Sequence, residues 1–315
     1  MKYRRPFFFI LAALGVASTA LGLASCGART DLRGRVAGDA TAEDHHVDGH
    51  ADADADTDAD APVDVVFPDV PIVTNCADAG TQYVYVITEQ NELYSFFPPT
   101  LGFSKIGDIG CSQTETPFSM GVDRSGIAYS VFSNGDLFEI STLNAACKPT
   151  SFKPGQSGFT TFGMGFSGAA DAGETLYVAE STSQAPRLGT IDTQTFQLSV
   201  IGAFNPNASG RCELTGTGDG HLYAFCLPVV GSGGELVNLD PQTAQIISEV
   251  SVPVGTSQDA FAYAFYGGEF WIFTGPPNQS TTVTEFDPVS LTAKAVATLP
   301  STIVGAGVST CAPQK

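Results

Sequence analysis

Three groups of side chains in this 315-residue sequence could do chemistry: a histidine cluster, a run of aspartates and seven cysteines. His45, His46 and His50 lie close together, and imidazole suits zinc or copper. Aspartates alternate with small residues over 51–62, but this run lacks the glycine turn and closing glutamate of a calcium-binding EF-hand loop. We expect a plain spacer here rather than a specific metal site, with the three histidines as candidate metal ligands.

The residues around these groups have the composition of an extended linker. From residue 27 to about residue 74 there is almost no aromatic residue and no helical or strand periodicity. Closely spaced like charges repel, and alanine cannot bury enough surface to offset the entropy of ordering the chain. Pro62, Pro68 and Pro71 stiffen the chain further. We therefore predict a disordered acidic tether over residues 26–75.

The segment before the tether has the layout of an export signal. Residues 1–5 carry positive charge, and an uncharged run rich in Phe, Leu, Ala and Val follows to about residue 22. This run is shorter than the roughly 20 residues that a membrane-spanning helix needs. No stop-transfer cluster of Lys and Arg directly follows it. The pattern predicts a signal peptide over residues 1–25.

The end of that segment, Leu23-Ala24-Ser25-Cys26, resembles the lipobox of bacterial lipoproteins. The resemblance implies a diacylglyceryl group on Cys26, cleavage before it, acylation of the new N-terminus, and stable anchoring by several acyl chains. In similar Gram-negative lipoproteins an aspartate after the cysteine often retains the protein at the inner membrane. Gly27 stands there instead, which favours the outer membrane, on its periplasmic face or at the cell surface. The alternative is an ordinary secretory signal with Cys26 near the cut.

The charge balance limits the partners. The chain has 14 Lys and Arg against 33 Asp and Glu, a net charge of -19, and loss of the basic signal makes the mature protein still more acidic. Such a field repels nucleic acid and anionic lipid head groups. We expect no nucleic-acid partner, and contact with the membrane through the N-terminal lipid.

The remaining chain predicts an all-β domain built from repeats. From Cys76 onward it is rich in Val, Thr, Tyr and Phe, with frequent turn residues and no convincing helical stretch. A unit of strand, loop, strand, D-P-x-T-like turn and strand recurs, and another short strand precedes the later copies. The turn residues Ser141, Asp192, Asp240 and Asp287 lie roughly fifty residues apart. This spacing fits a four-stranded β-propeller blade.

The two ends of the repeat array complement each other. The first copy, from Gln82, lacks its leading strand, and the chain ends with a spare strand over 302–309. We expect this strand to complete the first blade, so that no edge is exposed. The result is a five-bladed β-propeller over 76–313, which resembles propellers built from "LYxID" repeats. The resemblance covers Cys76 to Cys311 and assigns no activity; a sandwich of hairpins is the alternative.

Six cysteines remain once Cys26 is lipidated, and an even set in an exported chain indicates disulfides. No CxxC pair exists, and His221 is the single histidine after the tether, which argues against a zinc site. In a complete blade a tight turn joins the first two strands. In the closing blade these two strands come from opposite ends of the repeat array, and Cys76 and Cys311 both fall where that turn should be. We therefore expect a Cys76–Cys311 bridge that staples the ring.

Two further pairs are predicted within the ring. Cys212 and Cys226 are equidistant from Asp219 in a hairpin turn, so they face each other across its strands. Cys111 and Cys147 then pair by elimination.

Chemistry in the propeller is harder to find. Propellers that resemble glycosidases place paired acidic residues on the innermost strands, as acid and nucleophile or base. Glu213 is the one acidic residue on the innermost strands predicted here, and its small neighbours favour a packed centre. His221, beside a turn, is expected to be exposed rather than a general base. Trp271 could stack a sugar and is the candidate ligand-binding residue, although its alternating strand position is typical of inter-blade core. No catalytic residue is predicted.

We predict a membrane-anchored lipoprotein whose propeller is a non-enzymatic binding or scaffold module in the cell envelope. An envelope protein or a glycan is the expected partner, and we expect a monomer without a cofactor. The alternative is a carbohydrate-active or lyase-type enzyme that acts through loops on one face. Acidic or histidine clusters facing the channel would favour the enzyme, and an exposed aromatic or apolar patch would favour binding.

Overall fold

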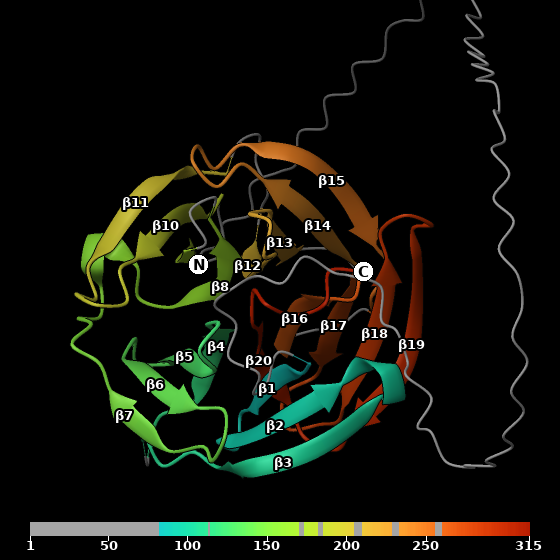
Figure 1. Cartoon of the computed structure of the whole chain (residues 1–315), viewed down its shortest axis with the longest axis horizontal. Helices are drawn as coiled ribbons and strands as arrows, with labels where there is room; N and C mark the ends of the chain where they lie inside the picture. Colours follow the sequence, from blue (N-terminus) through green and yellow to red (C-terminus); the bar gives the residue numbers. More distant parts are fainter. Residues whose placement is uncertain are drawn as a thin grey trace, which may run out of the picture. The chain divides into compact units, whose positions relative to one another are not determined.

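The computed structural model describes residues 82–112, 114–169, 173–181, 185–204, 210–228, 233–255 and 260–315. In these ranges twenty strands form five four-stranded sheets. Figure 1 shows the sheets arranged in a ring as the blades of a propeller. The predicted all-β, five-bladed fold is therefore confirmed.

Each blade has four antiparallel strands, which follow one another from the axis outward. From the axis, blade 1 contains β20 (Ile303–Val308), β1 (Val84–Thr88), β2 (Glu92–Phe97) and β3 (Gly102–Asp108). Blade 2 contains β4 (Pro117–Val122), β5 (Ile127–Phe132), β6 (Leu137–Ser141) and β7 (Cys147–Pro149). Blade 3 contains β8 (Phe162–Gly168), β9 (Glu174–Glu180), β10 (Arg187–Ile191) and β11 (Leu198–Ala203).

The last two blades follow the same order. Blade 4 contains β12 (Arg211–Gly216), β13 (Leu222–Leu227), β14 (Gly234–Leu239) and β15 (Ile246–Val252). Blade 5 contains β16 (Ala260–Tyr266), β17 (Glu269–Gly275), β18 (Thr281–Asp287) and β19 (Thr292–Leu299). Two short 3-10 helices, η1 (Pro98–Thr100) and η2 (Gln156–Gly158), lie in connections.

Blade 1 contains both ends of the propeller. Strand β20 pairs antiparallel with β1, with Val84 opposite Val308 and Ile87 opposite Gly305. The spare C-terminal strand thus supplies the innermost strand that the first repeat lacks. Because this pairing joins the first and last strands of the propeller, the ring has no open edge between its first and last repeats.

Aspartates cap the turns that join the third and fourth strands of a blade. The Oδ1 atom of Asp192 accepts the backbone N–H groups of Gln194 and Thr195, both at 2.8 Å. Asp240 and Asp287 cap the equivalent turns in blades 4 and 5 in the same way. This is the capping role that the D-P-x-T-like pattern predicts.

Glycine lets the innermost strands of neighbouring blades approach backbone to backbone. A Cβ on Gly165 of β8 would lie 2.5 Å from the carbonyl oxygen of Leu214 on β12. A Cβ on Gly307 of β20 would lie 2.8 Å from the backbone nitrogen of Val122 on β4. Such separations are too short for any side chain, so these positions require glycine. The centre is therefore closely packed, as the small residues predict.

We expect Gly165→Ala to lower the free energy of unfolding by about 1–3 kcal/mol, because the added methyl meets backbone that cannot move aside. Gly110→Ala is the matched control, since a Cβ there would meet nothing within 4 Å. Denaturant unfolding of both variants beside the parent measures the difference. Equal unfolding midpoints for the two variants would contradict the close approach of β8 and β12.

Candidate functional site

The centre of the ring holds one acidic side chain. Glu213, on β12, is 5% exposed, and it is the one acidic residue on the five innermost strands. Its Oε2 atom accepts a hydrogen bond at 2.5 Å from the hydroxyl of Ser119 on β4. That hydroxyl oxygen also accepts the backbone N–H of Met164 on β8, at 3.1 Å. Glu213 therefore links blades 2, 3 and 4 at the axis.

Burial raises the pKa of Glu213 well above its usual range, because the low-dielectric centre disfavours the carboxylate. Hydrogen bonds from Ser119 and the Met164 amide act against this shift, as does the more distant charge of Arg211. Glu213 is thus a buried, hydrogen-bonded acid that joins strands. A glycosidase would need a second carboxyl on the innermost strands, and these strands carry none.

The chain after β20, residues 309–315, crosses one end of the ring, and we call it the C-terminal strap (Figure 1). Thr310 donates its hydroxyl to Oε2 of Glu174 in blade 3 at 2.8 Å. The same hydroxyl oxygen accepts Nη2 of Arg124 in blade 2 at 3.2 Å. Further along, the carbonyl of Pro313 accepts the N–H of Gly267 in blade 5 at 2.8 Å. The strap therefore ties several blades together beyond the strand pairing of β20.

The Arg124–Glu174 pair under the strap is largely shielded from water, with side chains 12% and 13% exposed. Burial raises the pKa of Glu174, while hydrogen bonds from the Arg124 amide and Thr310, and the charge of Arg124, act against the rise. Because both side chains are occupied by each other and by Thr310, this cluster holds the fold.

A groove of about 500 Å³ lies between blades 5 and 1, beside the strap. Its walls include Leu101, Trp271 and the paired carboxyl groups of Glu269 and Glu285. Burial, the hydrogen bond with Glu285 and the charges of Glu285 and Asp287 raise the pKa of Glu269 to about 7. In this groove two carboxyl groups share a lining with apolar side chains.

The candidate Trp271 belongs to the packing between blades 5 and 1. It is 4% exposed, and its ring meets that of Phe96 edge-on, with centroids 5.4 Å apart. Its indole N–H donates to the carbonyl of Tyr266 at 3.2 Å. The indole thus packs in the core between blades 5 and 1, as is typical of its alternating place on the strand, and it also lines part of the groove.

His221 has the exposure expected for a residue beside a turn. Its side chain is 53% exposed, and its Nδ1 atom lies 3.0 Å from Oδ1 of Asp219 in the same turn. Within the described residues, no three His, Cys, Asp or Glu side chains are grouped closely enough to hold a metal ion.

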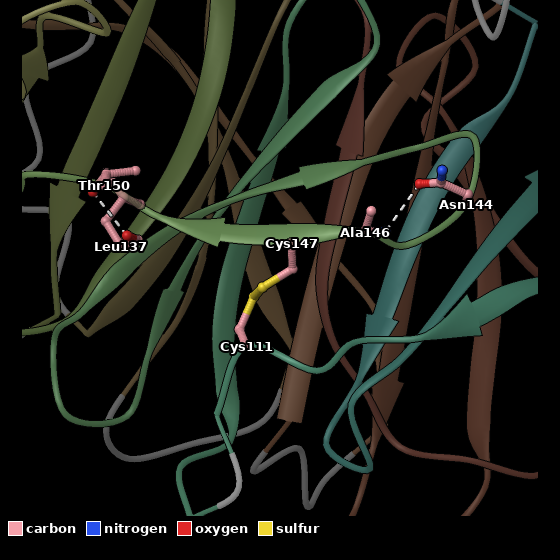
Figure 2. The surroundings of a disulfide bond; sticks show 6 residues. All are labelled: Cys111, Leu137, Asn144, Ala146, Cys147 and Thr150. Carbon is pink, nitrogen blue, oxygen red and sulfur yellow. Dashed lines mark hydrogen bonds between the residues drawn. A yellow bond between two sulfur atoms is a disulfide. The ribbon is translucent and has the colours of Figure 1, made fainter.

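Two predicted disulfides are present. Cys212 and Cys226 lie directly opposite each other on β12 and β13, with Cα atoms 4.0 Å apart. Cys111 bonds to Cys147, with Cα atoms 5.6 Å apart, and Figure 2 shows this bridge joining the loop before β4 to the outer strand β7. These pairings, one read from hairpin symmetry and one by elimination, are confirmed.

The third pair is only partly visible. Cys311 in the strap is disulfide-bonded. Its predicted partner, Cys76, lies outside the described residues. The predicted lipid attachment site, Cys26, and the histidine cluster of His45, His46 and His50 also lie outside them. None of the helices in the described part of the chain is long and apolar enough to span a bilayer.

Three features were not anticipated from the sequence: the strap, the Arg124–Glu174–Thr310 cluster and the Glu269–Glu285 pair. Arg124 and Thr310 are separated by 186 positions, so no local spacing connects them. The two glutamates lie on adjacent strands, and their shared face could have been found from strand alternation and the register that pairs Phe270 with Phe286.

The raised pKa of Glu213 predicts a pH-dependent stability. Its protonated form contributes fully below the unfolded pKa of about 4.3. The contribution is lost as pH rises from there through the folded pKa, because the unfolded chain has released its proton while the buried carboxyl still holds it. Glu213→Gln removes this titration, so it should gain stability relative to the parent by up to about 1.4 kcal/mol per pH unit within that window. Denaturant unfolding between about pH 4 and pH 9 measures it.

Ser119→Ala is the control for this prediction, because it removes the hydrogen-bond donor but keeps the titrating group. Its stability should still fall with pH relative to Glu213→Gln. Parallel pH profiles for the parent and Glu213→Gln would refute the assignment.

The chain matches no protein-family model and no curated protein. Among solved structures it is similar to TolB from Acinetobacter baumannii, with 11% identity, a TM-score of 0.41, and coverage of 71% of this chain and 55% of that one. It is also similar to a protein of unknown function from Bacteroides caccae (11% identity, TM-score 0.41, 72% and 98% coverage). It is also similar to an exo-beta-1,3-galactanase from Phanerochaete chrysosporium, with 13% identity, a TM-score of 0.43, and coverage of 62% of this chain and 51% of that one. These similarities concern the propeller fold alone.

Proposed function

We propose that this protein is exported, anchored to the outer membrane by lipid on Cys26, and acts through its propeller as a non-enzymatic binding or scaffold module. The observation that carries the non-enzymatic part is the occupied axis. Backbone contacts fill the centre, and its one carboxyl group, Glu213, is buried against Ser119. A propeller built this way has its faces and grooves available for binding, while its centre serves the fold.

The anchor rests on the residues of the lipobox-like segment. Cys26 follows small residues after an apolar run, the arrangement that lipoprotein processing requires. Two disulfides, Cys212–Cys226 and Cys111–Cys147, support the proposal because such bonds persist in oxidising compartments such as the periplasm.

The groove between blades 5 and 1 does not favour the enzyme alternative. Retaining glycosidases hold their two carboxyl groups about 5 Å apart, and inverting enzymes hold them further apart to admit a water. Glu269 and Glu285 instead share a hydrogen bond. Both carboxyl groups come from adjacent strands of one blade, so they do not flank the groove from opposite sides.

Cys26→Ser should release the protein from the membrane fraction, because the thiol that carries the lipid is lost. Ser25→Ala keeps a small residue before the cysteine and should leave the protein membrane-bound. Fractionation of cells, with intact mass measured for each variant, detects both effects. Membrane association of Cys26→Ser equal to that of the parent would remove the anchor from the proposal.

Binding of the mature protein to an array of glycans and envelope components should be saturable and leave the bound glycan intact. Product analysis by mass spectrometry separates binding from turnover. Release of shortened glycans, abolished by Glu269→Gln, would replace the binding module with an enzyme.

A further inference from the structure

The turns between the third and fourth strands of the blades share one exposed tip position. Chain order and strand register place all five turns at the end of the ring that carries the strap, which we call the strap face. The exposed tip residues, in blade order, are Pro99, Leu143, Gln194, Gln242 and Val289. Blades 3 and 4 therefore present glutamine at this position, whereas blades 1, 2 and 5 present an apolar side chain.

The three apolar tips belong to neighbouring blades. The innermost strand of blade 1, β20, packs against β16 of blade 5 on one side and β4 of blade 2 on the other. Val289 is 91% exposed and Leu143 is 73% exposed, the two largest values among the exposed large hydrophobic residues. Leu291 is 56% exposed at the turn of Val289, and Tyr83 is 37% exposed just before β1.

We call these side chains the apolar arc: Tyr83, Pro99, Leu143, Val289 and Leu291. Single exposed apolar residues are ordinary on protein surfaces. The arc differs because its members share one face and contiguous blades, while the turn tips of the remaining two blades, Gln194 and Gln242, are polar.

The N-terminal segment joins the propeller in the middle of this arc. Strand β1 begins at Val84, opposite Val308, and Thr310 of the strap follows directly. The chain that leads back to Cys26 therefore enters at the strap face, in blade 1, between the apolar tips of blades 5 and 2.

We propose that the strap face docks on a lipid surface, with the side chains of the apolar arc inserted at its interface. This inference rests on the proposed lipid anchor at Cys26, which brings the face and the membrane together. A few partly inserted apolar side chains bury too little surface to hold the protein at a membrane alone. A tether makes that weak contact intramolecular and raises its effective concentration.

The charge of the protein selects the lipid. A net charge of -19 opposes approach to an anionic surface, so the partner surface is zwitterionic. Docking in this orientation turns the opposite face of the ring, which carries the β1–β2 turn with Gln90, away from the membrane toward an envelope partner.

The test uses the lipidated full-length mature protein in phosphatidylcholine vesicles, with tryptophan as a depth reporter. Trp271 is the single native tryptophan and is buried, so it serves as a constant background. Val289→Trp should lose emission when the vesicles contain brominated phosphatidylcholine. Gln90→Trp, exposed on the opposite face, should keep its emission, as should the parent.

Leu143→Trp provides a second reporter in another blade and should lose emission like Val289→Trp. Introducing Val289→Asp beside Leu143→Trp should restore part of that emission, because an inserted carboxylate opposes docking. Vesicles made anionic with phosphatidylglycerol should weaken the loss. Emission from Val289→Trp and Leu143→Trp that is no more quenched than that of Gln90→Trp would overturn the docking.

Intact mass separates the two levels of the proposal. A lipidated protein whose strap-face tryptophans are not quenched keeps the anchor and rejects the docking. A protein that carries no lipid on Cys26 overturns the anchor and, with it, the docking.

Discussion

The close approach of five inner strands around one axis is the constraint on which the rest of this propeller depends. Gly165 and Gly307 allow backbone to meet backbone where any side chain would clash with the neighbouring blade. The space that could form a channel is thereby used for packing. Catalytic or binding groups at the axis would need that space, so the faces of the ring are where the described side chains can meet a partner.

The polar contacts at the centre follow from the same packing. Glu213 is buried at the axis, away from water, so its carboxyl group is stable at that position only in the neutral form or with hydrogen-bond donors. Ser119, on another blade, supplies one such donor. The contact therefore joins blades rather than serving chemistry. At the end of the ring, Thr310 does the same with Arg124 and Glu174, so that a strand and a strap both close the ring.

The two faces of the ring consequently differ in what they offer. The strap face carries the start of β1 and the apolar tips of three neighbouring blades, including Leu143 and Val289. The opposite face carries the turns between the second and third strands of the blades, such as the β1–β2 turn with Gln90. The proposed lipid anchor and a proposed partner would therefore be served by different faces of the ring.

Much of the architecture was predictable because it is encoded locally. The turn residues Ser141, Asp192, Asp240 and Asp287 mark a repeat, alternation defines its strands, and a spare final strand predicts ring closure. Hairpin symmetry likewise placed Cys212 opposite Cys226. The tertiary structure alone decided contacts that cross blades: the packing of Trp271 on Phe96, the reach of Thr310 to Arg124 and the gathering of the apolar arc. These contacts between blades depend on how each blade is oriented about the axis. The residues involved are far apart in the chain, so no local sequence pattern indicates that they meet.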